Sequence, residues 1–331
     1  MKSVLFNSTK VKSMQPLSVR VINKTIEAEG IVSFELSSED GSLLPSFSAG
    51  SHIDVYVKPG VIRQYSLCNH PDETTRYLIS VLRDAKSRGG SVAMHDEVNK
   101  GDVIQISEPR NHFQLVRAKR TLLFAGGIGV TPLLCMAERL AITGADFEMH
   151  YCTRSPAHTA FQRRIIAAAF AERVHFHFDD GHPSQRLALA PLLAEASDNT
   201  HIYVCGPAGF ISWVTGTAKA SGWLDDRIHT EYFGAGATDK SADRSFSVKI
   251  ASTGLVVSIP ADEPVTTVLA RHGIEIPISC EQGVCGTCLT RVLEGEPEHH
   301  DLYMTEEERA KNNQFTPCCS RARSSLLVLD L

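Results

Sequence analysis

The chain has 331 residues, of which 43% are hydrophobic and 21% are charged, and its formal net charge is −5. These values are typical of a globular protein with two or three domains, and the lack of a basic block argues against general nucleic-acid binding. No apolar stretch approaches the roughly 18 residues of a membrane span. Residues 1–10 lack the apolar run of a secretory signal, so we expect a cytoplasmic protein.

The nine cysteines predict a metal-bearing module near the C-terminus. Their odd number argues against a closed disulfide framework, and a reducing compartment would leave the thiols free. Four are scattered through the chain, whereas the other five follow residue 279. This clustering favours a separate module.

Residues 17–117 show the alternation of β-strands. The runs Val32–Leu36, Ile53–Val57 and Tyr77–Val81 alternate hydrophobic with other residues, and glycines and prolines separate the runs. Several short alternating strands predict an antiparallel barrel or sandwich.

From Thr121 onward, predicted strands alternate with helices, which is typical of a doubly wound parallel sheet. Ligands of such sheets bind beyond the carboxyl ends of the strands. We expect helices up to about Thr143 and over Ala160–Ala171. The expected strands are Thr121–Ala125, Phe147–Cys152, Val174–Phe178, His201–Cys205 and Ile228–Tyr232.

A small, polar stretch at Gly234–Asp243 separates this region from the last part of the chain. There we expect a hairpin of Phe246–Ile250 and Val256–Ile259, a helix over Val265–His272 and a closing strand at Leu326–Leu331. The predicted division is therefore residues 1–117, 118–236, a linker at 237–245, and 246–331.

The cysteine loop carries the strongest motif. Cys280, Cys285 and Cys288 have the spacing C-x4-C-x2-C, with further cysteines at 318 and 319, and this is the plant-type [2Fe–2S] pattern. Gly283 and Gly286 would let the backbone approach a cluster. A structural zinc site is the alternative, but zinc modules favour paired C-x2-C units and only one such pair is present.

One of the adjacent residues Cys318 and Cys319 must be a spectator, because neighbouring side chains on an extended segment point in opposite directions. We choose Cys318 as the fourth ligand.

A glycine loop, Ala125-Gly-Gly-Ile-Gly-Val-Thr-Pro132, follows a predicted strand and opens a helix. Its glycines would let the backbone approach a pyrophosphate, with Thr131 as N-cap and Pro132 as the first helical residue. An ordinary tight strand–helix turn is the alternative. Cys205-Gly206-Pro207 ends another strand at the same edge and favours the nucleotide interpretation.

Two features bear on which nucleotide binds. Asp179 and Asp180 end a strand and would repel the 2′-phosphate of NADPH, so NADH is expected if this loop faces the ribose. Arg154 also follows a strand, and it keeps NADPH possible.

The run Arg63-Gln64-Tyr65-Ser66 lies in the barrel region and offers a charge, hydrogen bonds and an aromatic face. The run Arg88-Gly-Gly-Ser91 precedes a helical segment, where backbone N–H groups could hold a phosphate.

These motifs carry a resemblance to a known family. The segment Ile278–Leu331, including Phe315-Thr-Pro-Cys-Cys-Ser-Arg-Ala322, resembles the ferredoxin domain of the phthalate dioxygenase reductase family, which includes vanillate demethylase reductases. Arg-x-Tyr-Ser, the glycine loop and Cys-Gly-Pro resemble the ferredoxin–NADP reductase superfamily. The likeness extends over nearly the whole chain in the order flavin barrel, nucleotide domain, ferredoxin domain.

The resemblance implies an antiparallel β-barrel flavin domain, an α/β doubly wound nucleotide-binding domain and an α+β β-grasp ferredoxin domain. It implies FMN rather than FAD, Cys318 as a cluster ligand, and Ser66 and Cys205 as catalytic residues. With the motifs, it assigns FMN to Arg63, Gln64, Tyr65, Ser66, Val81, Leu82, Gly89, Gly90, Ser91, Thr131 and Phe233. NADH is assigned to Gly127, Gly129, Arg154, Asp179, Cys205, Gly206 and Pro207.

The implied function is an NADH-dependent reductase that feeds a Rieske-type oxygenase acting on an aromatic acid. A flavin is needed because a nicotinamide gives two electrons as a hydride and a cluster accepts one. The acidic stretches Glu294–Asp301 and Glu306–Glu308 could steer a basic partner or form a solvated face. The alternatives are a reductase for a P450 or another hydroxylase, and a non-enzymatic carrier with zinc in the cysteine loop.

Overall fold

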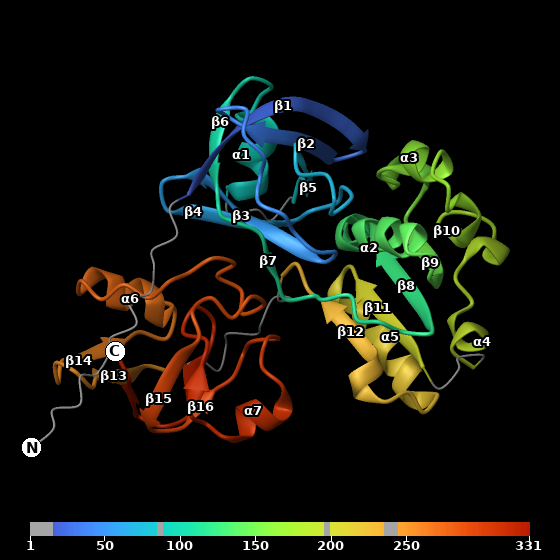
Figure 1. Cartoon of the computed structure of the whole chain (residues 1–331). Helices are drawn as coiled ribbons and strands as arrows, with labels where there is room; N and C mark the ends of the chain where they lie inside the picture. The colour runs from blue at the N-terminus through green and yellow to red at the C-terminus, as the bar shows by residue number, and fades with distance from the viewer. Residues whose placement is uncertain (1–15, 85–88, 195–198, 235–243) are drawn as a thin grey trace, which may run out of the picture.

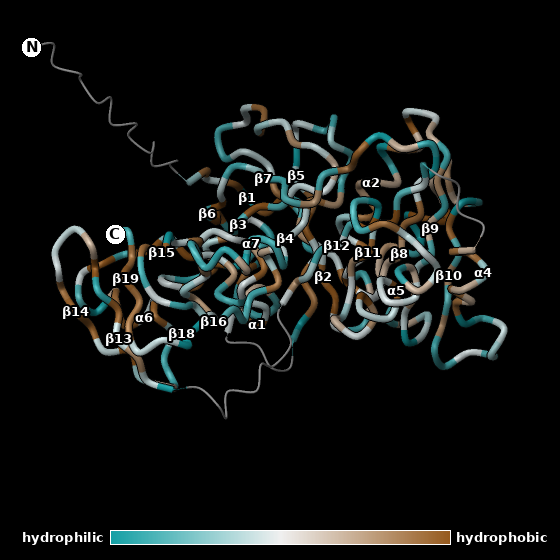
Figure 2. Tube along the Cα trace, turned by 90° about the horizontal axis from the view of Figure 1, so that it is seen from below, coloured by the Kyte–Doolittle hydropathy of each residue, from teal (hydrophilic) through white to brown (hydrophobic). Residues whose placement is uncertain are grey.

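The computed structural model describes residues 16–84, 89–194, 199–234 and 244–331. Figure 1 shows three regions that follow one another in sequence, coloured from blue through green to red. In Figure 2 the hydrophobic stretches lie mainly on strands inside these regions. The predicted linker falls mostly outside the described residues, because its positions 237–243 are among those not described.

Among the described residues, seven strands form the first region, and all their pairings are antiparallel. The order is β4-β3-β6-β1-β2-β5, with β7 beside β3. A bridge between Leu67 and Ile79 joins the end of β4 to β5 and closes the sheet into the predicted barrel. Its elements are β1 (Leu17–Ala28), β2 (Ile31–Ser38), β3 (Ser51–Lys58), β4 (Val61–Ser66), β5 (Tyr77–Leu82), α1 (Gly90–Asp96), β6 (Val103–Ile106) and β7 (Arg110–Asn111).

The second region is a parallel sheet in the order β10-β9-β8-β11-β12. The chain order reverses between β8 and β11, so a crevice opens at their carboxyl ends, as the doubly wound prediction requires. The elements are β8 (Arg120–Gly126), α2 (Val130–Ile142), β9 (Asp146–Thr153), α3 (Gln162–Ile166), β10 (Val174–Phe178), α4 (Leu189–Ala194), β11 (Thr200–Cys205), α5 (Ala208–Ala220) and β12 (Ile228–Glu231).

The helix expected over Ala160–Ala171 is much shorter, since α3 spans only Gln162–Ile166. Phe161 has a positive φ of 58° before the helix, and the chain turns again after it. Phe161 and Phe170 are both buried in the same hydrophobic core. Packing both rings there outweighs the helix propensity of the alanine run, so the prediction was wrong in extent.

The third region is a mixed sheet in the order β14-β13-β19-β15-β17, with a separate pair of β16 and β18. β13 and β19 are parallel, and α6 contributes Val265, Val268 and Leu269 to the core beneath. The elements are β13 (Phe246–Ile250), β14 (Val256–Ile259), α6 (Val265–Arg271), β15 (Thr290–Glu294), β16 (Pro297–Glu298), α7 (Glu306–Ala310), β17 (Gln314–Phe315), β18 (Arg321–Ala322) and β19 (Leu326–Leu329).

The hydrophobic cores show how the regions are joined. One core contains Ile31 and Phe113 from the barrel side together with Leu123 and Met149 of the parallel sheet. The core of the third region is built from residues 246–329. The first two regions therefore share buried apolar surface, whereas the third packs around its own core. Among the described helices, none has the length and hydrophobicity to span a bilayer.

Candidate functional site

A pocket opens between the barrel and the glycine loop, and we call it the barrel pocket. β4 and β5 supply one wall, and the loop after β8 supplies another. Its lining residues are Arg63, Gln64, Tyr65, Ser66, Ser80, Leu82, Asp84, Ser91, Ile128, Thr131, Phe233 and Gln282. The structure thus brings together eight of the eleven positions predicted for the flavin.

Arg63 is placed by a glycine at the start of α1. A Cβ atom on Gly90 would lie 2.6 Å from Cγ of Arg63, so the arginine occupies the space that this glycine leaves free. NH1 of Arg63 donates to the carbonyl of Ile62 at 2.7 Å. Ser91 is also held, because its Oγ accepts a hydrogen bond from the backbone N–H of Asp84 at 3.2 Å.

The three other predicted flavin positions do not line the barrel pocket. Val81 is 1% exposed in the barrel core. Gly89, with φ 94°, caps α1, and Gly90 lies under Arg63. The sequence interpretation missed Ser80, Asp84, Ile128 and Gln282, and Asp84 is a carboxylate on the wall beside Arg63.

At the base of the barrel pocket, Ser66 Oγ donates to Glu231 Oε2 at 3.3 Å. Glu231 is half-buried as a residue, and desolvation of its carboxyl group raises its pKa to about 8. Burial, with the Glu231 carboxyl nearby, raises the pKa of the Cys205 thiol. Cys205 is 0% exposed and does not line the barrel pocket.

A larger cavity of about 900 Å³ lies beyond the carboxyl ends of the parallel strands, and we call it the nucleotide pocket. This volume is within the range of small-molecule sites. Five predicted residues line it: Gly127, Arg154, Asp179, Gly206 and Pro207. The wall of this pocket carries side chains of both charges, because Arg186 and Glu29 also line it.

Gly129 does not line the nucleotide pocket, but it lets the two strand-end loops meet. A Cβ there would lie 2.2 Å from the carbonyl oxygen of Cys205. Gly206 approaches Gly126 in the same way, with 2.9 Å from its ideal Cβ to Cα of Gly126. The glycines therefore serve close backbone packing between β8 and β11.

The start of α2 differs from the prediction. The helix begins at Val130 with Gly129 as its N-cap, after a 3-10 turn over Gly127–Gly129. Thr131 Oγ1 donates backward to the carbonyl of Ile128 at 3.1 Å and so does not act as N-cap. Pro132 is tolerated inside the first turn because its missing N–H would have no partner there.

The cysteine loop gathers its four predicted ligands. Cys280, Cys285, Cys288 and Cys318 are all buried. Hydrogen bonds from Cys285 and Cys318 lower the pKa of the Cys280 thiol, and a hydrogen bond from Cys318 lowers that of Cys288. The sulfur of Cys280 therefore lies next to those of Cys285 and Cys318, and the sulfur of Cys288 lies next to that of Cys318. Cys319 is half-buried and close to Cys318, with its Sγ 3.3 Å from Thr316 Oγ1.

The backbone of this loop fits a cluster. Gly283 and Gly286 have positive φ values of 71° and 69°. Backbone N–H groups of Gln282 and Thr287 point to the sulfurs of Cys280 and Cys285 at 3.4 and 3.5 Å. Among the described residues no group of three or more ligating side chains is spaced to hold a single metal ion. The fit to a cluster depends on the four thiols and these N–H groups.

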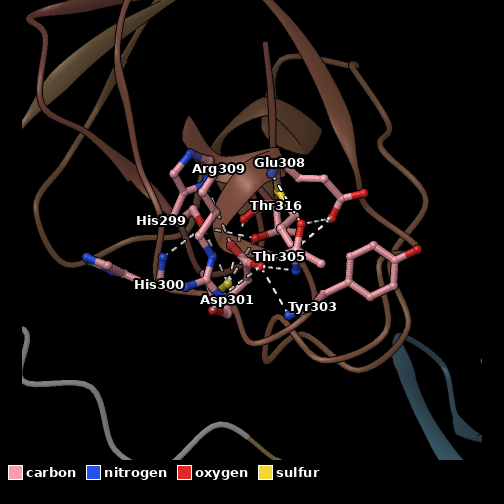
Figure 3. A network of polar contacts seen from close by, with 11 residues as sticks. His299, His300, Asp301, Tyr303, Thr305, Glu308, Arg309 and Thr316 are labelled. Atoms are coloured by element: carbon pink, nitrogen blue, oxygen red, sulfur yellow. Dashed lines mark hydrogen bonds and ion pairs between the residues drawn. The ribbon is translucent and has the colours of Figure 1, made fainter. Parts of the chain in front are cut away.

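The segment after the loop is fixed by Asp301, which is 2% exposed (Figure 3). Its Oδ2 accepts hydrogen bonds from the backbone N–H groups of Tyr303 and Met304 at 3.1 and 2.7 Å. Glu308 forms a reciprocal capping box with Thr305. Asp301 is thus not part of an exposed acidic face, because the loop uses its carboxylate internally.

A third pocket separates the barrel from the cysteine loop, and we call it the cysteine pocket. Residues from all three regions line it, including Ser66, Glu231 and Cys285. Phe233 and Gln282 line the barrel, nucleotide and cysteine pockets alike. The sequence signalled Phe233 through its family motif, whereas Gln282 stands within the cysteine motif and was interpreted only as part of the cluster loop.

Comparison with known proteins supports this assembly. The family described as "2Fe-2S iron-sulfur cluster binding domain" matches residues 248–323. Over 313 residues the chain is 55% identical to vanillate O-demethylase oxidoreductase of Pseudomonas putida, with 94% of this chain and 98% of that protein covered.

Two solved structures are similar over 96% of this chain. One is a phthalate dioxygenase reductase, described as a modular structure for electron transfer from pyridine nucleotides to [2Fe–2S], with a TM-score of 0.77, 37% identity and 98% of its chain covered. The other is a type IV self-sufficient cytochrome P450 monooxygenase, with a TM-score of 0.81, 38% identity and 41% of its chain covered. The predicted fold class is confirmed, and the chain belongs to the phthalate dioxygenase reductase family of oxidoreductases, the reductase components of oxygenase systems.

Proposed function

We propose that the protein is the NADH-dependent, FMN-containing reductase component of a Rieske-type oxygenase that acts on an aromatic acid, in a dioxygenase or an O-demethylase system. The observation that carries this proposal is that the barrel, nucleotide and cysteine pockets share Phe233 and Gln282. Groups bound in these pockets would be neighbours, and electron transfer between them depends on such proximity.

A bound FMN would supply the conversion between the two-electron hydride chemistry of a nicotinamide and the one-electron chemistry of a [2Fe–2S] cluster. The residues of the chain then have to hold and orient these groups, and no nucleophile is needed. We assign Arg63 to the flavin phosphate, because its positive charge lies on the wall with Ser91.

Tyr65 and Ser66 are assigned to the flavin ring. Burial raises the pKa of the Tyr65 phenol, so this group stays protonated and can donate a hydrogen bond. Ser66 is 5% exposed and is oriented by its bond to Glu231. We assign Ser66 to the reactive edge of the flavin, with Glu231 and the buried Cys205 behind it.

NADH is the proposed reductant. Asp179 lies on the wall of the nucleotide pocket, and its carboxylate would repel the extra phosphate of NADPH. Arg154 and Arg186 lie on the same wall, and their positive charges would attract that phosphate. The ratio of kcat/KM for NADH to that for NADPH tests this preference, and Asp179→Asn is expected to lower it.

The proposed cluster ligands are Cys280, Cys285, Cys288 and Cys318. Their convergence and the N–H groups facing Cys280 and Cys285 support this assignment. We also propose domain boundaries after residues 117 and 236. A cytoplasmic location is proposed because the nine cysteines, all of which the structure describes, form no disulfide bond.

A second candidate is the reductase of a cytochrome P450. It is favoured by the structural similarity to part of a self-sufficient P450 monooxygenase, of which this chain covers 41%. The similarity to vanillate O-demethylase oxidoreductase over 98% of that protein favours the first candidate. Reduction of purified Rieske oxygenases and of P450 enzymes by the protein and NADH would separate the two.

The test of the proposed function is an anaerobic titration of the purified protein with NADH, followed in the visible spectrum. We expect bleaching equivalent to about three electrons, two in the flavin and one in the cluster, and FMN in the acid-released fraction. A protein without flavin or cluster absorbance after reconstitution would contradict the proposal and favour a carrier role.

A further inference from the structure

A buried hydrogen bond joins the barrel to the cysteine loop. Ser279, directly before Cys280, donates from Oγ to Asp54 Oδ1 at 2.7 Å, although the two residues are 225 positions apart. Asp54 lies on β3 and is 5% exposed, and Ser279 is 2% exposed. A hydrogen bond to a carboxylate is about twice as strong as one between neutral groups, so this contact is a strong tie between the two regions.

The carboxylate of Asp54 is held from the barrel side. Gln64 Nε2 donates to Asp54 Oδ1 at 3.1 Å, and Arg110 forms an ion pair with Oδ2. The backbone N–H of Asp54 donates to Ser107 Oγ at 2.9 Å. With both oxygens engaged inside the barrel, Asp54 presents Oδ1 to the cysteine loop in one orientation.

The hydrogen bond between Ser279 and Asp54 lies between the proposed flavin site and the cluster loop. Gln64 lines the barrel pocket, and its Nε2 also lies 3.2 Å from His52 Nε2. Gln282 follows Ser279 by three residues and forms part of the wall of the same pocket. Any displacement of Ser279 would therefore move both a cluster ligand and a wall of the flavin site.

Little apolar packing surrounds the Ser279–Asp54 hydrogen bond, so apolar contacts do little to hold the cysteine loop against the barrel. In the described part of the chain, the hydrophobic core beneath the cysteine loop takes no buried residue from the barrel. An edge-to-face contact of His112 with Tyr303, with ring centroids 6.4 Å apart, lies at the same interface. Interfaces without a large apolar core allow relative motion of the parts they join.

We propose that Asp54 is a positioning residue: through Ser279 it fixes the cysteine loop against the barrel pocket, and the rate of cluster reduction depends on this bond. The proposal rests on the proposed function for its kinetic part. Its structural part, the anchoring of the loop by Asp54, stands on the contacts alone.

The test compares the holoprotein with Ser279→Ala and with the matched control Ser258→Ala, which changes an exposed serine of β14 in the same region. Stopped-flow mixing with NADH follows flavin and cluster absorbance separately. Hydrogen exchange of the amides of residues 278–288 measures anchoring without reference to activity.

For Ser279→Ala we expect a cluster bleaching rate lowered about tenfold, a smaller change in the rate of flavin bleaching, and faster exchange in the loop. A tenfold change corresponds to about 1.4 kcal/mol, which is within the contribution of one hydrogen bond to a charged group. Ser258→Ala should match the unaltered protein in all three measurements. Equal cluster rates and equal exchange in Ser279→Ala would overturn the proposal.

A second variant decides the outcome if Ser279→Ala does not retain its cluster. Asp54→Ala removes the acceptor oxygen from the barrel and leaves the sequence of the loop intact. Slower cluster bleaching and faster loop exchange in Asp54→Ala would support the proposal, and unchanged values would overturn it. If NADH bleaches neither the unaltered protein nor any variant, the proposed function is wrong. The hydrogen-exchange data then still decide whether Asp54 anchors the loop.

Discussion

Ser66 Oγ donates a hydrogen bond to Glu231 Oε2 at 3.3 Å, and this bond joins the barrel to the last strand of the parallel sheet. Desolvation raises the pKa of the Glu231 carboxyl to about 8. The carboxyl is therefore mostly neutral at pH 7, although an ordinary glutamate would be ionised. A neutral carboxyl at this position adds no negative charge next to the proposed flavin.

The first prediction concerns the pH dependence that Glu231 confers. As the pH rises through about 8, the carboxyl ionises, and its charge opposes the arrival of a hydride in the barrel pocket. We expect the rate of flavin reduction to fall, by about tenfold for each 1.4 kcal/mol of repulsion. Glu231→Gln should keep the neutral rate between pH 6 and about 9, as measured by stopped-flow absorbance.

The raised pKa of Glu231 also makes the stability of the folded protein depend on pH. Because the pKa is higher in the folded protein than in an unfolded chain, the associated stability is fully present below the ordinary glutamate pKa and is lost as the pH rises toward 8. If the plot of unfolding free energy against pH keeps its inflection near pH 8 in Glu231→Gln, the effect belongs to another group.

The second prediction concerns Gly90 and Arg63. Alanine at position 90 would place Cβ 2.6 Å from the Arg63 side chain, and the flexible arginine has to move. We expect Gly90→Ala to raise the dissociation constant of FMN about tenfold, the loss expected for a weakened hydrogen bond to a charged group. Arg63→Ala should raise it further, as measured by fluorescence titration of the apoprotein.

Gly216→Ala in α5 is the matched control, because nothing lies within 4 Å of a Cβ atom at that position. It should leave FMN affinity unchanged. Full flavin retention in Arg63→Ala would remove Arg63 from the site.

The third prediction concerns the contact between β8 and β11. Alanine at Gly129 would place Cβ 2.2 Å from the Cys205 carbonyl oxygen, and the backbone there has little room to move. We expect Gly129→Ala to destabilise the parallel sheet by about 1–3 kcal/mol or more and to raise the KM for NADH. Thermal unfolding and steady-state kinetics with a dye acceptor measure the two effects.

Gly209→Ala in α5 has open space around its Cβ and should change neither quantity. An unaltered Tm in Gly129→Ala would contradict this close contact between the two loops.

The fourth prediction separates the two adjacent cysteines. Cys318 is hydrogen bonded to Cys280 and Cys288, whereas Cys319 contacts Cys318, Thr316 and Ser320. We expect Cys318→Ser to lose the cluster absorbance and to retain NADH-to-dye activity through the flavin. Cys319→Ser should keep its cluster, and the reverse pattern would make Cys319 the ligand.

Local patterns were enough to predict most elements of the fold. The strands Val174–Phe178, Phe246–Ile250 and Val256–Ile259 have the predicted bounds, because their hydrophobic alternation and flanking turn residues are contiguous in sequence. The predictions were weaker where a distant core competes with local propensity. At α3 the burial of Phe161 and Phe170 in one core shortens a helix that the alanine-rich sequence favours.

The same distinction between local sequence and distant contacts applies to the candidate site. The sequence by itself determined the chemistry of this protein, because the residues of the cysteine loop, of the glycine loop and of the Arg-x-Tyr-Ser motif stand a few positions apart within each motif. Only the tertiary structure decided how these parts cooperate. The bonds of Ser66 with Glu231 and of Asp54 with Ser279 span 165 and 225 positions. No spacing rule or periodicity relates such residues, since their proximity follows from closure of the barrel, reversal of the strand order at β8 and β11, and packing of the cysteine loop against β3.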